Sequence, residues 1–328
     1  MKKRDSFFDS LKFILICLVV FGHVLEYSGI RDMLSFKVYS FIYVFHMPLF
    51  IFISGYFSKN ITRDKLKKSI RTLLPAYFVF QAILSIPNML DGSFSIFNFL
   101  FSPQGVLWYI LALLYWRIAF YFVPKARFLN PPIVIVISIL VSFLIGLVNY
   151  PVFLAIAKTI AFLPYFALGY YCTENTIEKI RGWNKAISIA ILIIAFSLVA
   201  SFTTSDFVLN LYGEFSYKYV FGSIYGGLWW RVVSIVSAII LSCAVINLST
   251  IKLYKWGEKT LDIYLLHAPL VYIGYGALLK KFEVYPDFWI ALVVFVIIMS
   301  LCIFMIRIKA FQYLVNPSLL FEQKKKRE

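Results

Sequence analysis

The chain has 328 residues, of which 61% are hydrophobic and 15% are charged, and its mean hydropathy is +0.83. Soluble domains carry about 25% charged residues, so this composition argues against a soluble enzyme and indicates a polytopic membrane protein. The net charge of +16 does not indicate a nucleic-acid partner, because membrane proteins gather basic residues in their cytoplasmic loops.

Apolar runs close to 20 residues long, enough to cross about 30 Å of hydrocarbon, recur along the chain. The ten predicted spans are 7–28, 36–57, 70–87, 104–123, 131–148, 151–172, 184–202, 224–247, 260–280 and 286–308. We therefore expect an all-α bundle of about ten transmembrane helices that forms a single domain over residues 1–328. No signal-peptidase-like site follows the first run, so we expect it to be retained as a span.

The distribution of basic residues predicts the orientation of these spans. Most of the 32 Lys and Arg residues fall in segments that alternating spans place on one side of the membrane. These are the N-terminus, 59–71, 125–127, 179–185, 252–259 and the stretch from residue 307 onward. The bias predicts that both termini are cytoplasmic. We expect residues 310–328 to form a basic cytoplasmic tail that also contacts anionic membrane lipid.

The first span reads "DSLKFILICLVVFGHVLE" and carries ionisable residues inside an apolar helix. Lys12 and His23 are eleven residues apart, so they lie within roughly 20° of each other around the helix and about 16 Å apart along it. Glu26 follows His23 by three residues, which places it either to orient the imidazole and raise its basicity or simply to lie at the outer interface. Taken singly, Lys12 can reach for the interface and His23 can bond to a neighbouring helix. Ionisable residues on one face of a span favour a functional site.

Basic and aromatic residues in the next segments add candidates for binding. The second span, "FIYVFHMPLFIFISGYFSKN", places His46 beside Pro48. The basic segment after it carries Lys68 and Arg71, which serve either membrane topology alone or the binding of a phosphate group near a helix N-terminus.

Later spans supply further candidates. "QGVLWYILALLYWRI" places Trp108 and Tyr109 near the outer membrane interface, where aromatic residues are also expected without a ligand. "DIYLLHAPLV" places His267 in the ninth span, where an internally bonded histidine is as good an interpretation as a substrate-binding one. The charges inside spans that belong to no motif are Arg117, Lys158 and Arg231.

Several kinds of site are not predicted. The four cysteines lie in separate apolar runs, which argues against a disulfide framework or a CxxC motif. The sequence has no Walker A, HExxH or GxSxG motif. The three histidines lie in different spans without metal-ligand spacing, so we expect no metal site.

Taken in order, these segments resemble the membrane acyltransferase family 3, most closely its fucose 4-O-acetylase-like branch of bacterial sugar O-acetyltransferases. The resemblance covers nearly the whole chain. "FHMPLFIFISGYF" matches a specific family segment, and "LWYILAL" and "IYLLHAP" match two others. The family's Arg-x10-His motif falls on Lys12 and His23, and its Arg-x-x-Arg element falls on Lys68 and Arg71. Lysine at positions 12 and 68 keeps the charge but loses the bidentate fork of arginine.

This resemblance implies an integral membrane enzyme of the cell membrane. No soluble esterase-like domain follows the last predicted span, so we expect the enzyme to stand alone. It implies transfer of an acyl group, usually acetyl from cytoplasmic acetyl-CoA, to a hydroxyl of a carbohydrate acceptor. We expect Lys12, Lys68 and Arg71 to bind the donor, and His23, with Glu26, to act as general base or to form an acyl-imidazole. The expected substrate-binding residues are His46, Trp108, Tyr109 and His267. The alternatives are a glycan transporter or flippase and a non-catalytic component of polysaccharide export.

Overall fold

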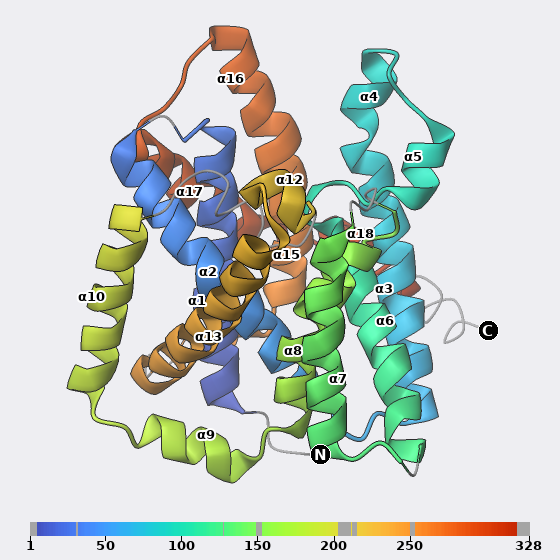
Figure 1. Cartoon of the computed structure of the whole chain (residues 1–328). Coiled ribbons are helices and arrows are strands. Elements are labelled where there is room, and N and C mark those ends of the chain that lie inside the picture. The colour runs from blue at the N-terminus through green and yellow to red at the C-terminus, as the bar shows by residue number, and fades with distance from the viewer. Residues whose placement is uncertain are drawn as a thin grey trace.

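The structure is a computed structural model that describes residues 5–30, 32–126, 128–148, 153–202, 211, 215–249 and 253–319. The described residues are mostly helical and contain no strand. Several long helices run between the two ends of the molecule, and some of the short helices lie at those ends (Figure 1). The predicted all-α membrane bundle is confirmed.

The helices of the first half are α1 (Ser6–Tyr27), α2 (Met33–Tyr56), α3 (Arg63–Leu84), α4 (Ile86–Leu90), α5 (Ile96–Phe101), η1 (Gly105–Leu107), α6 (Trp108–Phe122), η2 (Val123–Lys125), α7 (Pro131–Leu144) and η3 (Ile145–Leu147). Those of the second half are α8 (Ile156–Tyr171), α9 (Glu174–Arg181), α10 (Lys185–Phe202), α12 (Tyr217–Phe221), α13 (Ile224–Leu248), α14 (Tyr254–Gly257), α15 (Thr260–Pro269), η4 (Leu270–Tyr275), α16 (Gly276–Phe282), α17 (Phe288–Met305) and α18 (Lys309–Val315). The segment η4 is a π-helical turn.

Each of the ten predicted spans has a helix in the described part of the chain. Seven segments are long and apolar enough to cross a membrane: α1, α2, Gly105–Lys125, α10, α13, Thr260–Phe282 and α17. The other three predicted spans correspond to α3, to the 17-residue segment Pro131–Leu147 and to the 16-residue α8. The predicted turn at 148–151 and the end of the tail, 320–328, lie largely outside the described residues.

The basic segment after the second span is helical, not a loop. Helix α3 begins at Arg63, well before the predicted start at residue 70, because the Thr62 side chain accepts a hydrogen bond from the Lys65 amide and caps the helix. Lys68 and Arg71 therefore lie on the first turns of α3.

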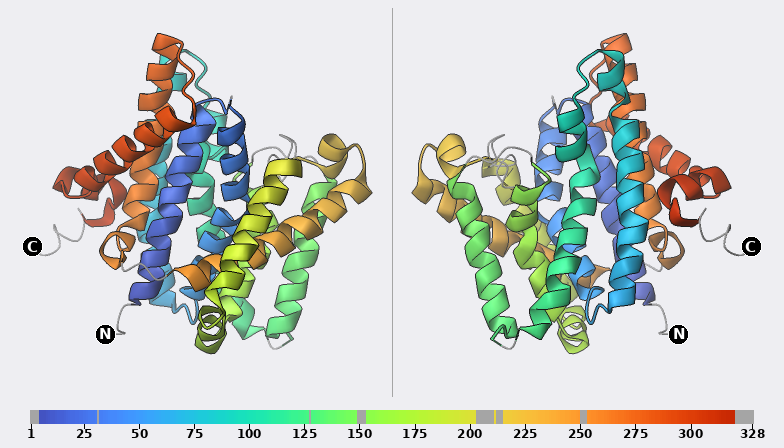
Figure 2. Two further views of the ribbon diagram at one scale, coloured as in Figure 1. Left: turned by 90° about the vertical axis from the view of Figure 1, so that its left-hand side faces the viewer. Right: turned by 90° about the vertical axis from the view of Figure 1, so that its right-hand side faces the viewer.

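Helix α1 is the central element of the bundle. Asp5 caps its start by accepting hydrogen bonds from the amides of Phe7 and Phe8. Its apolar side chains are buried on several faces, because it packs against α2, α14, α15 and α17. In Figure 2, α1 lies between α17 on one flank and α10 with α13 on the other. Helices α10 and α17 bury few of their side chains within the protein, as expected for helices that contact lipid.

Helices α2 and α8 pack closely through two glycines. A Cβ at Gly55 of α2 would overlap the carbonyl oxygen of Phe166, and a Cβ at Gly169 of α8 would overlap the carbonyl oxygen of Phe52. Small residues allow such close backbone approach between membrane helices. Close packing against α8 therefore accounts for the glycine in the "ISGYF" part of the second span.

We call the end of the bundle that holds the start of α1, the α2–α3 turn and α9 the basic end. It is the lower end in Figure 1, where α9 lies. The described residues at this end include Lys59, Lys65, Lys67, Lys68, Lys179 and Arg181. Helices α4, α5 and α16 lie at the opposite end (Figure 1).

Candidate active site

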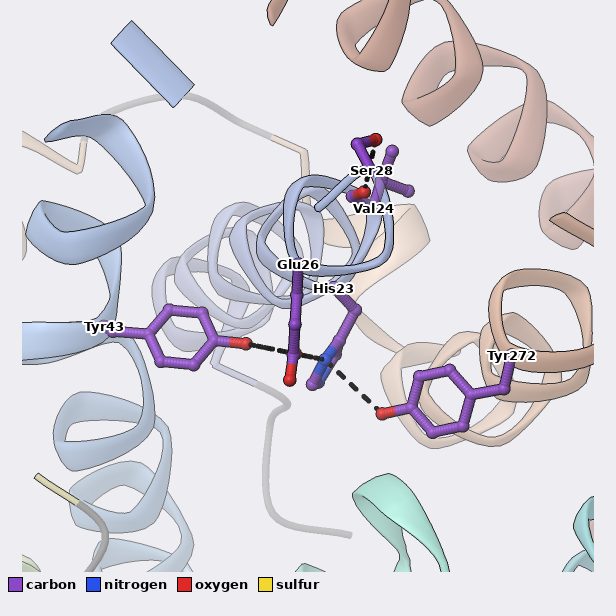
Figure 3. A network of polar contacts seen from close by, with 6 residues as sticks. All are labelled: His23, Val24, Glu26, Ser28, Tyr43 and Tyr272. Atoms are coloured by element: carbon purple, nitrogen blue, oxygen red, sulfur yellow. Dashed lines mark hydrogen bonds and ion pairs between the residues drawn. The ribbon is translucent and has the colours of Figure 1, made fainter. Parts of the chain in front are cut away.

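His23 and Glu26 form a pair on the last turns of α1, towards the end opposite the basic end. Their spacing of three residues places both side chains on one face of the helix. The Nδ1 atom of His23 lies 3.0 Å from Oε2 of Glu26 (Figure 3). The carboxylate accepts a hydrogen bond from Nδ1, so the neutral ring carries its proton there and leaves a lone pair on Nε2. A histidine held this way is suited to act as a base.

Two tyrosines from other helices contact the His23–Glu26 pair. Tyr43 of α2 donates a hydrogen bond of 3.0 Å to Oε2 of Glu26, and Tyr272 of η4 places its hydroxyl 3.4 Å from Nδ1 of His23. Figure 3 shows the two rings pointing at the pair from opposite sides. The Tyr43 hydroxyl also lies 3.5 Å from Nδ1 of His23, which is too long for a strong bond. Tyr43 therefore acts mainly on Glu26.

Tyr272 is positioned by close packing around η4. The Ser28 and Tyr275 hydroxyl oxygens are 2.8 Å apart, which ties the end of α1 to this π-helical turn. Gly105 lies against the Tyr272 ring, has a φ of +49°, and would overlap that ring if it carried a Cβ. Both facts favour glycine at this position. π-helical turns are frequent at functional sites.

The other two histidines of the chain lie beside this pair. His267 of α15 stacks on His23 with ring centroids 5.7 Å apart, and His46 of α2 contacts the Tyr43 ring at 4.8 Å. Each donates from Nδ1 to a carbonyl of its own helix, His46 to Ile42 at 2.7 Å and His267 to Ile263 at 3.1 Å. Both rings are buried, and Nε2 of His267 has no hydrogen-bond partner among the described residues. Three distant spans thus bring all three histidines together.

This histidine cluster is not arranged as a metal site. Among the described residues, no group of three His, Cys, Asp or Glu side chains is placed to hold a metal ion. The Nδ1 atoms of His46 and His267 are already bonded to carbonyls, and Glu26 already binds His23 and Tyr43.

Lys12 lies near the basic end of α1 and points into the bundle. Its ammonium is 2.6 Å from Oδ1 of the buried Asp9 and 5.2 Å from the centre of the Phe57 ring. It lines a pocket of about 250 Å³, together with Arg117 and residues of α2, α6 and α15. Lys68 and Arg71, expected beside Lys12, have exposed side chains on α3 and do not line this pocket.

Trp108 and Tyr109, expected near the outer interface, are buried within the protein. The Trp108 ring stacks on Phe162 at 5.3 Å, with the Lys158 ammonium 5.4 Å from its centre. The Tyr109 hydroxyl lies 2.6 Å from that of Ser54, and Tyr109 lines the same pocket as Lys12. Tertiary packing buries both rings against neighbouring helices, and their position near the outer interface stays a prediction.

Outside the spans, Asp32 helps to place the start of α2. It caps the helix by accepting a hydrogen bond of 2.8 Å from the Ser35 amide. Burial raises the pKa of Asp32, but the hydrogen bonds from Ser35 outweigh this effect and hold its pKa below the ordinary value. The cap therefore stays charged at neutral pH.

Comparison with known proteins identifies the family. The acyltransferase domain family matches residues 5–307, nearly the whole chain. The chain belongs to this acyltransferase family. The match concerns the family as a whole, so membership of the fucose 4-O-acetylase-like branch stays a prediction.

Two curated relatives of this acyltransferase family member are nodulation proteins. Nodulation protein NolL of Mesorhizobium japonicum is 27% identical over 199 residues, and that of Sinorhizobium fredii is 30% identical over 191 residues. The alignments cover 56% and 54% of this chain and 50% of each relative, so the chain spans about half the length of the curated relatives it matches. No solved structure matches the chain.

Proposed function

We propose that this protein is a membrane O-acyltransferase that moves an acetyl group from cytoplasmic acetyl-CoA to a hydroxyl of a cell-surface or lipid-linked carbohydrate. The observation that carries the proposal is the His23–Glu26 pair, in which the carboxylate accepts a hydrogen bond from Nδ1 and leaves the lone pair of the neutral imidazole on Nε2. Membership of the acyltransferase family supports acyl transfer. The motif resemblance to sugar O-acetyltransferases supports the carbohydrate acceptor.

In this proposal His23 is the general base. Its Nε2 takes the proton of the acceptor hydroxyl while the hydroxyl oxygen attacks the thioester carbonyl. A C–O bond forms, the C–S bond breaks, and the imidazolium returns its proton to the thiolate that leaves. Glu26 stabilises the imidazolium and keeps the neutral ring in the tautomer that exposes the Nε2 lone pair. If an acyl-imidazole forms instead, the same atom is the nucleophile.

The orientation of the bundle fits a donor from the cytoplasm. Positive charge concentrates at the basic end, which the positive-inside rule assigns to the cytoplasm. His23 then lies towards the opposite side, about 16 Å of helix from Lys12. The donor enters from the basic end and the acceptor approaches from the other, in a bacterial cell membrane.

Acetyl transfer from radiolabelled acetyl-CoA, measured in membranes that contain the full chain, tests this function. We expect His23→Ala to lower the transfer rate by about 100-fold or more, since a general base contributes at least that much. Wild-type transfer by His23→Ala at equal expression would sink the assigned mechanism. Glycan movement by the wild-type protein without acetyl-CoA consumption would instead favour a transporter. Glycans from knockout and wild-type cells, compared by mass spectrometry, identify the acceptor.

A further inference from the structure

The pocket beside Lys12 contains a second half-buried cation, Arg117, which has no part in the proposed mechanism. Arg117 lies on α6, two turns beyond Tyr109, and its side chain lines the pocket of about 250 Å³. Its Nε donates to Oγ of Ser58 at 3.4 Å, and its Nη1 donates to Oγ of Ser69 at 2.9 Å. Among the described residues no carboxylate forms an ion pair with it.

The two cations of this pocket differ in what neutralises them. Lys12 is paired with Asp9 at 2.6 Å, whereas the side-chain hydrogen bonds of Arg117 in the described part of the chain go to the neutral hydroxyls of two serines. A charge held inside a membrane protein without a counter-ion is costly and marks a functional position. Glu258 also lines the pocket, but it is exposed, so solvent screens its charge from a bound anion.

The guanidinium retains donors for a ligand. An arginine has five N–H donors in a planar fork, and two of its nitrogens here each make one bond to a serine. The remaining N–H groups are suited to the oxygens of a phosphate, which arginine binds with two parallel bonds.

The inner wall of the pocket leads to the histidine cluster. Tyr109 and Tyr264 line the pocket, and their ring centroids are 5.4 Å apart. The Tyr264 ring lies 5.8 Å from that of His267, which stacks on His23 at 5.7 Å. A ligand anchored at Arg117 therefore has its far end within a few side chains of the proposed base.

We propose that Arg117 binds a phosphate of the acyl donor, the one next to the pantetheine arm of acyl-CoA, in the pocket it shares with Lys12. This assignment rests on the proposed function, because it takes acyl-CoA as the donor. The arm extends from Arg117 past Tyr109 and Tyr264 towards His23. Lys68 and Arg71, exposed on α3, attract the anion from the cytoplasm rather than hold it.

The test compares ligands that differ by one phosphate. Pantetheine and 4′-phosphopantetheine are titrated against the purified full-length protein in nanodiscs by isothermal calorimetry. We expect the wild-type protein to bind 4′-phosphopantetheine about tenfold or more tightly than pantetheine, as a charge-assisted contact requires. In Arg117→Gln this preference disappears while pantetheine affinity stays the same. A loss of folding would not remove the preference selectively.

Two further variants keep the test decisive. Arg63→Gln removes an exposed cation at the same end and should keep the full phosphate preference. Leu261→Trp fills the pocket from α15 with Arg117 intact and should weaken both ligands at least tenfold, even if Arg117→Gln does not fold.

The outcomes separate this inference from the proposed function. A phosphate preference retained by Arg117→Gln, or affinities unchanged by Leu261→Trp, overturns the assignment of the pocket. A wild-type protein that binds pantetheine and 4′-phosphopantetheine equally well also overturns the assignment of the pocket. In each of these cases acetyl transfer by the wild-type protein leaves the proposed function standing. Absence of that transfer rejects the function by itself.

Discussion

His23 is held by a carboxylate on one ring nitrogen and left open on the other. In the proposed mechanism the two side chains have separate roles, because Glu26 fixes the tautomer and Nε2 of His23 takes the proton. Tyr43 in turn holds Glu26, since its hydroxyl donates a hydrogen bond to the carboxylate oxygen that contacts His23. The orientation of the base therefore depends on a residue of α2.

At the residue scale, we expect Tyr43→Phe to lower kcat of acetyl transfer about tenfold, because a hydrogen bond to a charged group contributes about 1.5–3 kcal/mol. Glu26→Gln should lower kcat further, since the amide no longer stabilises the imidazolium or enforces the tautomer. Steady-state kinetics with labelled acetyl-CoA measure both effects.

A matched control is available in Tyr77, a buried tyrosine whose hydroxyl has no hydrogen-bond partner among the described residues. Tyr77→Phe should leave kcat and thermal stability unchanged or slightly raise stability. Equal losses of kcat in Tyr43→Phe and Tyr77→Phe would show that the Tyr43 effect is one of packing and not of the carboxylate.

The residue scale also shows what the sequence can and cannot predict. The His23–Glu26 contact was predicted from a spacing of three on one helix, which is a local property. The approach of Tyr43, Tyr272 and His267 depends on which helices are neighbours, so no spacing signals it. The same limit explains why the burial of Trp108 was not predicted, and why Lys68 and Arg71, expected to bind the donor together with Lys12, face outward.

At the scale of elements, the contact between α2 and α8 depends on two small residues. Gly55 and Gly169 each lie against a carbonyl group of the other helix, so an added methyl group must push the backbones apart. Gly169→Ala should lower the melting temperature of the detergent-solubilised protein by several degrees, because overpacking costs about 1–3 kcal/mol.

Gly182→Ala is the control for this prediction. A Cβ at Gly182, at the end of α9, would meet its nearest atoms at an ordinary distance of 3.5 Å. We expect an unchanged melting temperature for this variant in the same thermal-melt assay. A Gly169→Ala protein that melts with the wild type would contradict the tight packing of α2 on α8.

The sequence predicted the positions of helices with long apolar runs, such as α1, α2 and α13. Two elements departed from the expectation for physical reasons. Helix α3 extends into the basic segment because Thr62 caps it early. The charged residues there interrupt the apolar run from which the span was predicted, so the sequence did not indicate these first helical turns. The ninth span contains a π-helical turn after Pro269, and an i+5 hydrogen-bond pattern leaves no apolar signature.

At the scale of the whole molecule, sidedness is the property to test. The distribution of Lys and Arg predicts that the basic end is cytoplasmic. Single cysteines are introduced in a background that lacks the four native ones. We expect Lys67→Cys, at the exposed start of α3, to react with a membrane-impermeant maleimide only after permeabilisation.

Ser93→Cys, exposed between α4 and α5 at the opposite end, should react in intact cells. The extent of labelling is read by gel shift. Labelling of both positions from the same side would contradict the topology, and the reverse pattern would place the basic end outside. In either case the donor would have to reach the site by another route.

The order in which the chain is synthesised has a consequence for the candidate active site. Its parts come from residues 23–26, from 43–46 and from 267–272, so the first two regions are synthesised long before the third. A nascent chain that has inserted only its early helices holds the base and its carboxylate but lacks His267 and Tyr272. The candidate site is therefore completed only after α15 and η4 enter the membrane, so we expect acyl transfer to begin only once these late helices have been synthesised.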